Sequence, residues 1–87
     1  MAIALNPQLL ILDEPTQGLG PEEIEALKVL IRMIARDRTI LLIEHNMSVV
    51  LDLSHRITVM DRGRILAEGS PAEIEANADV QRVYLGQ

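Results

Sequence analysis

Residues Leu9–Pro15 read Leu-Leu-Ile-Leu-Asp-Glu-Pro, and the rest of the chain is best understood from them. A short continuous apolar run that ends in turn residues is typical of a strand buried on both faces of a parallel sheet. Asp13 and Glu14 then lie at the carboxyl end of this strand, where open parallel sheets bind ligands. One acid there can hold Mg²⁺, directly or through water, while the other orients or deprotonates a water molecule. A core strand that runs into a solvated acidic turn explains the same residues without any chemistry.

A second apolar run without alternation, Thr39–Ile43, ends two residues before His45. Between the two runs the apolar spacing predicts a helix over residues 21–36, with Pro21 at its first position. A strand, a helix and a strand of these lengths predict one right-handed βαβ unit with parallel strands. Because parallel strands end at the same edge of a sheet, we expect the two acids and His45 to converge. A single histidine at a strand end is, by itself, more often structural than functional.

The remainder of the chain predicts an antiparallel hairpin with short helices around it. Asp61-Arg62-Gly63 is a tight-turn signal, and Ser70-Pro71-Ala72-Glu73 combines a cap, a proline and an acid that open a helix. The expected elements are a helix over 47–53, strands over 57–60 and 64–68, a helix from 71 to 75 or 76, and a helical turn or two over 79–85. Met1–Leu5 is expected to be the last turn of a helix that ends before Pro7, and it is too short for a membrane span or a signal peptide.

Composition narrows the classes of function. The chain has 87 residues, enough for one small domain, and its net charge is −5. There is no Trp or Phe, and Tyr84 is the single aromatic residue, so neither a basic surface nor a stacking platform for nucleic acid is expected. No cysteine is present, which excludes a disulfide framework and a thiolate metal site.

With these residues in place, the sequence resembles the ATP-binding subunits of ABC transporters. Residues 9–14 resemble the Walker B strand and its catalytic glutamate, 16–20 fall at the D-loop, and 43–46 resemble the switch-histidine segment. The run 57–71 matches the strand, hairpin and Gly-x-Pro turn that follow, and 79–86 is similar to the tails of branched-chain amino acid importers. The resemblance covers residues 1–87 as the C-terminal part of a nucleotide-binding domain, from Walker B to the C-terminus.

The resemblance implies a role for each polar residue at the expected edge. Asp13 would position Mg²⁺, Glu14 would polarise the attacking water, and His45 would contact the γ-phosphate of ATP. The implied partners are ATP and membrane permease subunits, and the implied location is cytoplasmic, at the inner face of the cell membrane. Many family members have Asp where Gly20 stands, but members of the branched-chain type often lack it.

The implied fold is α/β, a partial P-loop NTPase of the ABC ATPase type in the order β-α-β-α-β-β-α. It comprises two parallel strands and a C-terminal antiparallel hairpin, and it lacks the phosphate-loop strand. The 87 residues contain no Gly-x-x-x-x-Gly-Lys-Ser/Thr loop, so the chain resembles a fragment or a truncated reading frame. We therefore expect no ATPase activity from the isolated chain. We also expect self-association, because the strands before His45 and from Ile57 would present unpaired edges.

Two other functions stay open on the sequence. One is a non-catalytic, self-associating α/β module that keeps the fold without the chemistry. The other is a small metal-dependent hydrolase in which Asp13, Glu14 and His45 together ligate a divalent metal.

Overall fold

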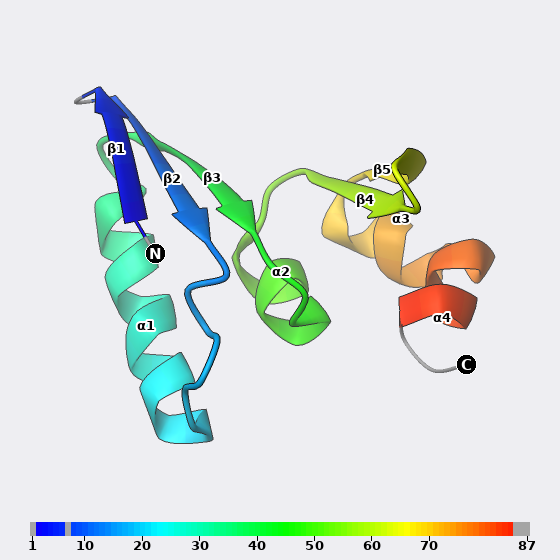
Figure 1. Cartoon of the computed structure of the whole chain (residues 1–87), viewed down its shortest axis with the longest axis horizontal. Coiled ribbons are helices and arrows are strands. Elements are labelled where there is room, and N and C mark those ends of the chain that lie inside the picture. The colour runs from blue at the N-terminus through cyan, green and yellow to red at the C-terminus, as the bar shows by residue number, and fades with distance from the viewer. Residues whose placement is uncertain (1, 7, 85–87) are drawn as a thin grey trace. The chain divides into compact units, whose positions relative to one another are not determined.

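The computed structural model describes the backbone of residues 2–6 and 8–84 and the side chains of residues 8–84. The chain divides after Asn46 into two compact units, which we call the N-terminal and the C-terminal unit. The N-terminal unit contains β1 (Ala2–Asn6), β2 (Leu9–Asp13), α1 (Pro21–Ile34) and β3 (Thr39–Ile43). The C-terminal unit contains α2 (Met47–Leu53), β4 (Ile57–Asp61), β5 (Arg64–Gly69), α3 (Pro71–Ala76) and α4 (Ala78–Tyr84) (Figure 1).

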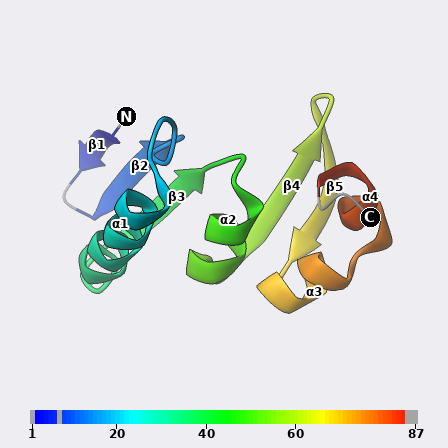
Figure 2. The same ribbon diagram turned by 90° about the horizontal axis from the view of Figure 1, so that it is seen from below.

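A three-stranded sheet in the order β1-β2-β3 forms the N-terminal unit. The strands β2 and β3 are parallel, as the sequence predicted, with Leu9 opposite Thr39 and Asp13 opposite Ile43. The helix α1 connects them and lies along the sheet (Figure 2). This register brings the carboxyl ends of β2 and β3 side by side, which positions the loops that follow both strands.

The expectation of a helix end at residues 1–5 is wrong for the described part, Ala2–Asn6, which is the strand β1. It pairs antiparallel with β2, with Ile3 opposite Ile11 and Ala4 opposite Leu10. Five residues are too few for a stable isolated helix, whereas pairing supplies partners for the backbone N–H and C=O groups on this edge of β2. Met1 lies outside the described residues.

The expectation of a strand buried on both faces is wrong for β3. Leu10 and Leu12 of β2 are buried, as is Ile31 of α1, but Leu41 and Ile43 of β3 are 52% and 47% exposed. Along β3 the side chains alternate between exposed and half-buried. In the described residues the N-terminal unit has a single helix, and one helix can cover only one face of a sheet.

The predicted hairpin is present in the C-terminal unit, with β4 antiparallel to β5 and Asp61 opposite Arg64. The turn residues Arg62 and Gly63 both have positive φ, +52° and +77°. Two successive residues in this conformation make the tight turn whose twist matches that of the strands, and Gly63 adopts it without a steric penalty.

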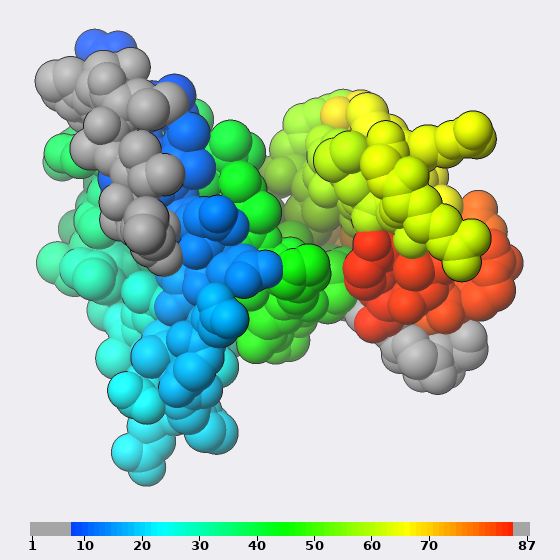
Figure 3. Space-filling view, in the orientation of Figure 1, coloured from blue at the N-terminus to red at the C-terminus, as the bar shows by residue number. Residues whose placement is uncertain are grey.

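The core of the C-terminal unit comprises five buried residues from four elements: Val50, Ile57, Val59, Ile74 and Val80. The helix α4 lies against the β4–β5 hairpin (Figure 3), and its Tyr84 hydroxyl donates to the backbone carbonyl of Met60. The last helix was expected over 79–85, and its described part ends at Tyr84, so residue 85 lies outside the described residues.

Candidate functional site

The structure brings Glu14 and His45 into direct contact. Glu14 follows β2 and His45 lies two residues after β3, and Nε2 of His45 is 2.6 Å from Oε1 of Glu14. The His45 side chain is 82% exposed and that of Glu14 is 33% exposed, so a ligand can reach the pair from solvent.

The backbone of Glu14 is left-handed, with φ at +50°. A residue with a Cβ takes this conformation at a cost of about 1–2 kcal/mol, and such outliers cluster at functional sites. A hydrogen bond of 2.7 Å from the Glu14 N–H to the carbonyl of Ile43 holds the turn against the end of β3. The strained turn therefore directs the Glu14 side chain towards the His45 loop.

Asp13 is the last residue of β2, and its side chain is exposed beside the Glu14 turn. Mg²⁺ takes oxygen ligands, and in nucleotide sites it is commonly held by one or two carboxylates together with the substrate phosphates. The oxygen donors present at this edge therefore fit Mg²⁺, with Asp13 as the residue that would hold it.

A second carboxylate, Glu44, connects the loops that follow β2 and β3. Its Oε2 accepts hydrogen bonds from the hydroxyl and the N–H of Thr16, at 2.7 Å and 3.2 Å. Its Oε1 accepts from the N–H groups of His45 and Asn46, at 3.0 Å and 3.4 Å. Burial alone would raise the pKa of Glu44, but these four hydrogen bonds outweigh it and lower the pKa below the ordinary value of 4.5.

Sequence reasoning named Asp13, Glu14 and His45 but missed the contact between Thr16 and Glu44. A signal for it was available in the predicted parallel register. Residues that follow Asp13 and Ile43 must lie at the same edge, so a hydroxyl on one loop and a carboxylate on the other are within reach. The apolar pattern itself carries no information on which polar side chains pair there.

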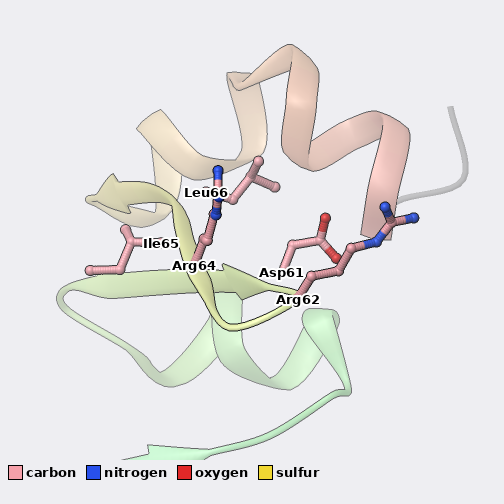
Figure 4. Close-up of a pocket in the computed structure, with 5 residues that line it drawn as sticks. All are labelled: Asp61, Arg62, Arg64, Ile65 and Leu66. Atoms are coloured by element: carbon pink, nitrogen blue, oxygen red, sulfur yellow. The ribbon is translucent and has the colours of Figure 1, made fainter.

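The C-terminal unit has an open hollow of about 510 Å³ at the turn of the β4–β5 hairpin. It is lined by Asp61, Arg62, Arg64, Ile65 and Leu66. Arg62, Arg64 and Ile65 spread away from one another (Figure 4), so the hollow has no convergent set of polar groups of the kind that ligand sites need.

In the described part of the chain, no three His, Asp or Glu side chains are arranged so that they could together hold a metal ion. The metal-dependent hydrolase, which needs Asp13, Glu14 and His45 as a ligand set, therefore gains no support from the described structure. Likewise, every helix in this part of the chain is too short or too polar to cross a lipid bilayer.

Comparison with known proteins adds to this geometry. Residues 64–87 match a protein-family profile described as "Branched-chain amino acid ATP-binding cassette transporter". The high-affinity branched-chain amino acid transport ATP-binding protein BraF of Pseudomonas aeruginosa is 45% identical over 84 residues, and its counterpart LivG of Escherichia coli is 47% identical over 84. The chain is therefore similar to the C-terminal part of ATP-binding proteins of branched-chain amino acid transport.

The match to the two ABC subunits covers 94% of this chain but only 33% of each relative, so the chain spans about a third of their length. A solved structure agrees: the ADP conformation of MJ1267, an ATP-binding cassette of an ABC transporter, superposes with a TM-score of 0.74 at 27% identity. That alignment covers 92% of this chain and 34% of MJ1267. The expected α/β fold, a fragment of an ABC ATPase with a parallel and an antiparallel strand pair, is confirmed.

Proposed function

We propose that residues 1–87 supply the C-terminal part of an ATP-hydrolysing site in the ATP-binding subunit of an importer for branched-chain amino acids. The observation that carries the proposal is the 2.6 Å contact between Glu14 and His45 at the carboxyl ends of two parallel strands. This edge is where sheets of this kind bind ligands, and the strained backbone of Glu14 is of the kind found at active sites.

In this proposal each residue acts on a different part of the substrate. Glu14 orients the water that attacks the γ-phosphate and accepts its proton, while His45 donates a hydrogen bond to a γ-phosphate oxygen. Asp13 would hold Mg²⁺, and the bound ion would supply positive charge to stabilise the phosphates of ATP. The existing contact between His45 and Glu14 keeps the two side chains within reach of one reacting phosphate before it arrives.

The remainder of the site would come from outside these 87 residues. No sequence here matches the loop whose backbone amides and lysine hold the phosphates, so ATP binding by this chain alone is expected to be weak or absent. The relatives are named as transport ATP-binding proteins, so we further propose that the complete subunit works with membrane permease subunits at the cytoplasmic face of the cell membrane. A non-catalytic module with the same fold is the alternative.

A chimera with a relative tests the catalytic proposal. The chain replaces the 84 aligned residues of LivG from Escherichia coli, which are 47% identical and span 33% of that protein. We expect the chimera to hydrolyse ATP and the Glu14→Gln form to lose at least about 100-fold in kcat, because the general base is removed. Glu68→Gln, which removes a carboxylate in the C-terminal unit, is the control and should keep its activity. A Glu14→Gln chimera with full activity would refute the proposal and favour the non-catalytic module.

The isolated chain provides the complementary measurement. We expect no steady ATP turnover from residues 1–87, since positioning of the phosphates supplies most of the catalysis in phosphoryl transfer. Turnover that disappears on Glu14→Gln would show that the chain holds a complete site and would contradict this expectation.

We also propose that the isolated chain self-associates through β3. In the described residues β3 ends the sheet, and Leu41 and Ile43 on it are half exposed. An apolar strand with an unpaired edge is a template for pairing with a second copy. Sedimentation at micromolar concentration should show dimers or larger species, and Leu41→Lys should shift them to monomers while Ile65→Lys on β5 should not. A wild-type monomer at that concentration would contradict the proposal.

A further inference from the structure

We propose that Glu44 is a positioning residue, which holds the His45 loop against the Glu14 turn by clamping Thr16. The inference rests on the proposed function, because it assigns a task to a neighbour of the catalytic pair. It starts from an arrangement in which one carboxylate receives hydrogen bonds from two loops at once. Thr16 follows Glu14 by two residues and Glu44 precedes His45 by one, so the clamp lies next to the pair on both loops.

The hydrogen bonds of Glu44 favour a structural role over a direct role in the chemistry. An ionised carboxylate has about four lone-pair sites, and donors on Thr16, His45 and Asn46 approach both of its oxygens. These donors compete with any metal ion or water molecule for the carboxylate. Glu44 therefore differs from Glu14, whose Oε1 meets the exposed imidazole of His45.

Burial indicates that the clamp is a fixed part of the fold. Thr16 is 7% exposed, and its hydroxyl makes the shortest of the four hydrogen bonds, 2.7 Å. Hydrogen bonds to an ionised acceptor are about twice as strong as neutral ones, so the clamp favours one arrangement of the two loops. The Glu14 N–H bond to Ile43 ties the strand ends together, but the position of the His45 loop itself depends on Glu44.

Glutamine replaces this carboxylate only in part. Its single acceptor oxygen can face either the N–H of Thr16 or the N–H groups of His45 and Asn46. With the oxygen towards His45 and Asn46, the NH₂ group can donate to the Thr16 hydroxyl oxygen but opposes the Thr16 N–H. Glu44→Gln is therefore expected to weaken the connection between the loops, and with it the contact between Glu14 and His45, although the size of the side chain is unchanged.

The test is NMR on the 87-residue chain without nucleotide. In the wild type we expect a nuclear Overhauser effect between the His45 ring and the Glu14 side chain, with His55 as the reference histidine. Glu44→Gln should weaken this effect and speed amide exchange at His45 and Asn46 about tenfold, which is the size expected from losing a charged hydrogen bond. Glu68→Gln is the matched control, since Glu68 also accepts from a threonine hydroxyl, that of Thr58 at 2.9 Å.

Two substitutions of Thr16 keep the proposal testable if Glu44→Gln does not fold. Thr16→Val removes the hydroxyl at nearly constant shape and should weaken the His45–Glu14 effect, whereas Thr16→Ser restores the donor and should keep it. The proposal is overturned if Glu44→Gln or Thr16→Val leaves the effect at wild-type strength, or if Thr16→Ser or Glu68→Gln loses it. These spectra need no ATP, so their failure differs from failure of the catalytic proposal, which is read from the Glu14→Gln chimera.

Discussion

The two units of this chain differ in how completely they bury their apolar side chains. The C-terminal unit closes around five buried aliphatic residues from four elements. Among the side chains of residues 8–46, the buried apolar ones are Leu10, Leu12 and Ile31, and β3 leaves Leu41 and Ile43 half exposed. The same unit holds the strained Glu14 and its contact with His45. The candidate chemistry therefore lies in the unit with open surfaces, and the closed unit is the one expected to carry more of the stability.

The largest effect in this comparison should come from the core of the C-terminal unit. Ile74 is 1% exposed, so Ile74→Ala removes buried methyl groups and leaves a cavity, at an expected cost of about 3–4 kcal/mol in the free energy of unfolding. Ile65→Ala is the matched control, because Ile65 is 62% exposed and should cost less than about 0.5 kcal/mol. Urea unfolding measures both. Equal losses from the two variants would show that the C-terminal unit does not have the closed core described here.

Acid should act on the two units through different carboxylates. The folded-state pKa of Glu44 is lowered, so the stability it contributes is fully present above about pH 4.5 and is lost as the pH falls through its folded value. The pKa of Glu73 is also lowered, by hydrogen bonds with Ser70, so the C-terminal unit loses stability in the same direction. Amide exchange measured residue by residue from pH 6 to about pH 3 distinguishes the loss of stability in the N-terminal unit from that in the C-terminal unit.

The variants assign these losses to their units. Glu44→Gln should flatten the pH dependence of exchange in the N-terminal unit, and Glu73→Gln should flatten it in the C-terminal unit. If amide exchange in β2 and β3 depends on pH in Glu44→Gln as it does in the wild type, loss of the Glu44–Thr16 hydrogen bonds does not explain the acid destabilisation of the N-terminal unit.

How far the sequence predicts this molecule depends on whether a feature is local. The parallel pair, the hairpin turn at Gly63 and the capping residues around Ser70 were predicted because each has a short sequence signal. The strand at Ala2–Asn6 was not, because its conformation is decided by pairing with β2 rather than by its own five residues. The exposure of Leu41 was missed for a similar reason. An apolar run predicts a strand, but it carries no information on whether another element covers the second face of the sheet.

The candidate site divides in the same way. Asp13, Glu14 and His45 follow apolar runs, and a parallel register brings such residues to one edge. The left-handed backbone at Glu14 and the clamp between Thr16 and Glu44 depend on how two loops meet in space. The spacing of residues along the sequence does not specify the relative position of these two loops.

A smaller effect tests how the closed unit begins its helix α3. The Ser70 hydroxyl accepts from the N–H of Glu73 at 3.2 Å, and the Glu73 carboxylate accepts from the N–H of Ser70 at 2.9 Å. Ser70→Ala should cost about 1 kcal/mol, because one backbone donor loses its partner. Ser70→Asp is expected to retain most of the stability, since aspartate caps equally well. Equal free energies of unfolding for Ser70→Ala and Ser70→Asp would show that the Ser70 cap does not stabilise α3.

The smallest effect should come from giving α1 the cap that α3 already has. At α1 the N-cap is Gly20, whose N–H donates to the Glu23 carboxylate at 3.0 Å, but there is no side-chain cap in return. Its φ of −82° suits any residue, and an added Cβ would meet only the Glu23 carboxylate oxygen, at 3.6 Å. Gly20→Ser should therefore complete the capping box and gain a few tenths of a kcal/mol.

The neighbouring glycine provides the control for that gain. Gly18 has φ of +81°, where a side chain is strained, so Gly18→Ser should destabilise the N-terminal unit by about 1 kcal/mol. Opposite signs for the two serine variants in urea unfolding would show that backbone conformation, and not loop composition, governs this turn. A loss from Gly20→Ser would mean that the open N-terminal unit needs glycine at both positions, for a reason other than the backbone angle or the space around a Cβ.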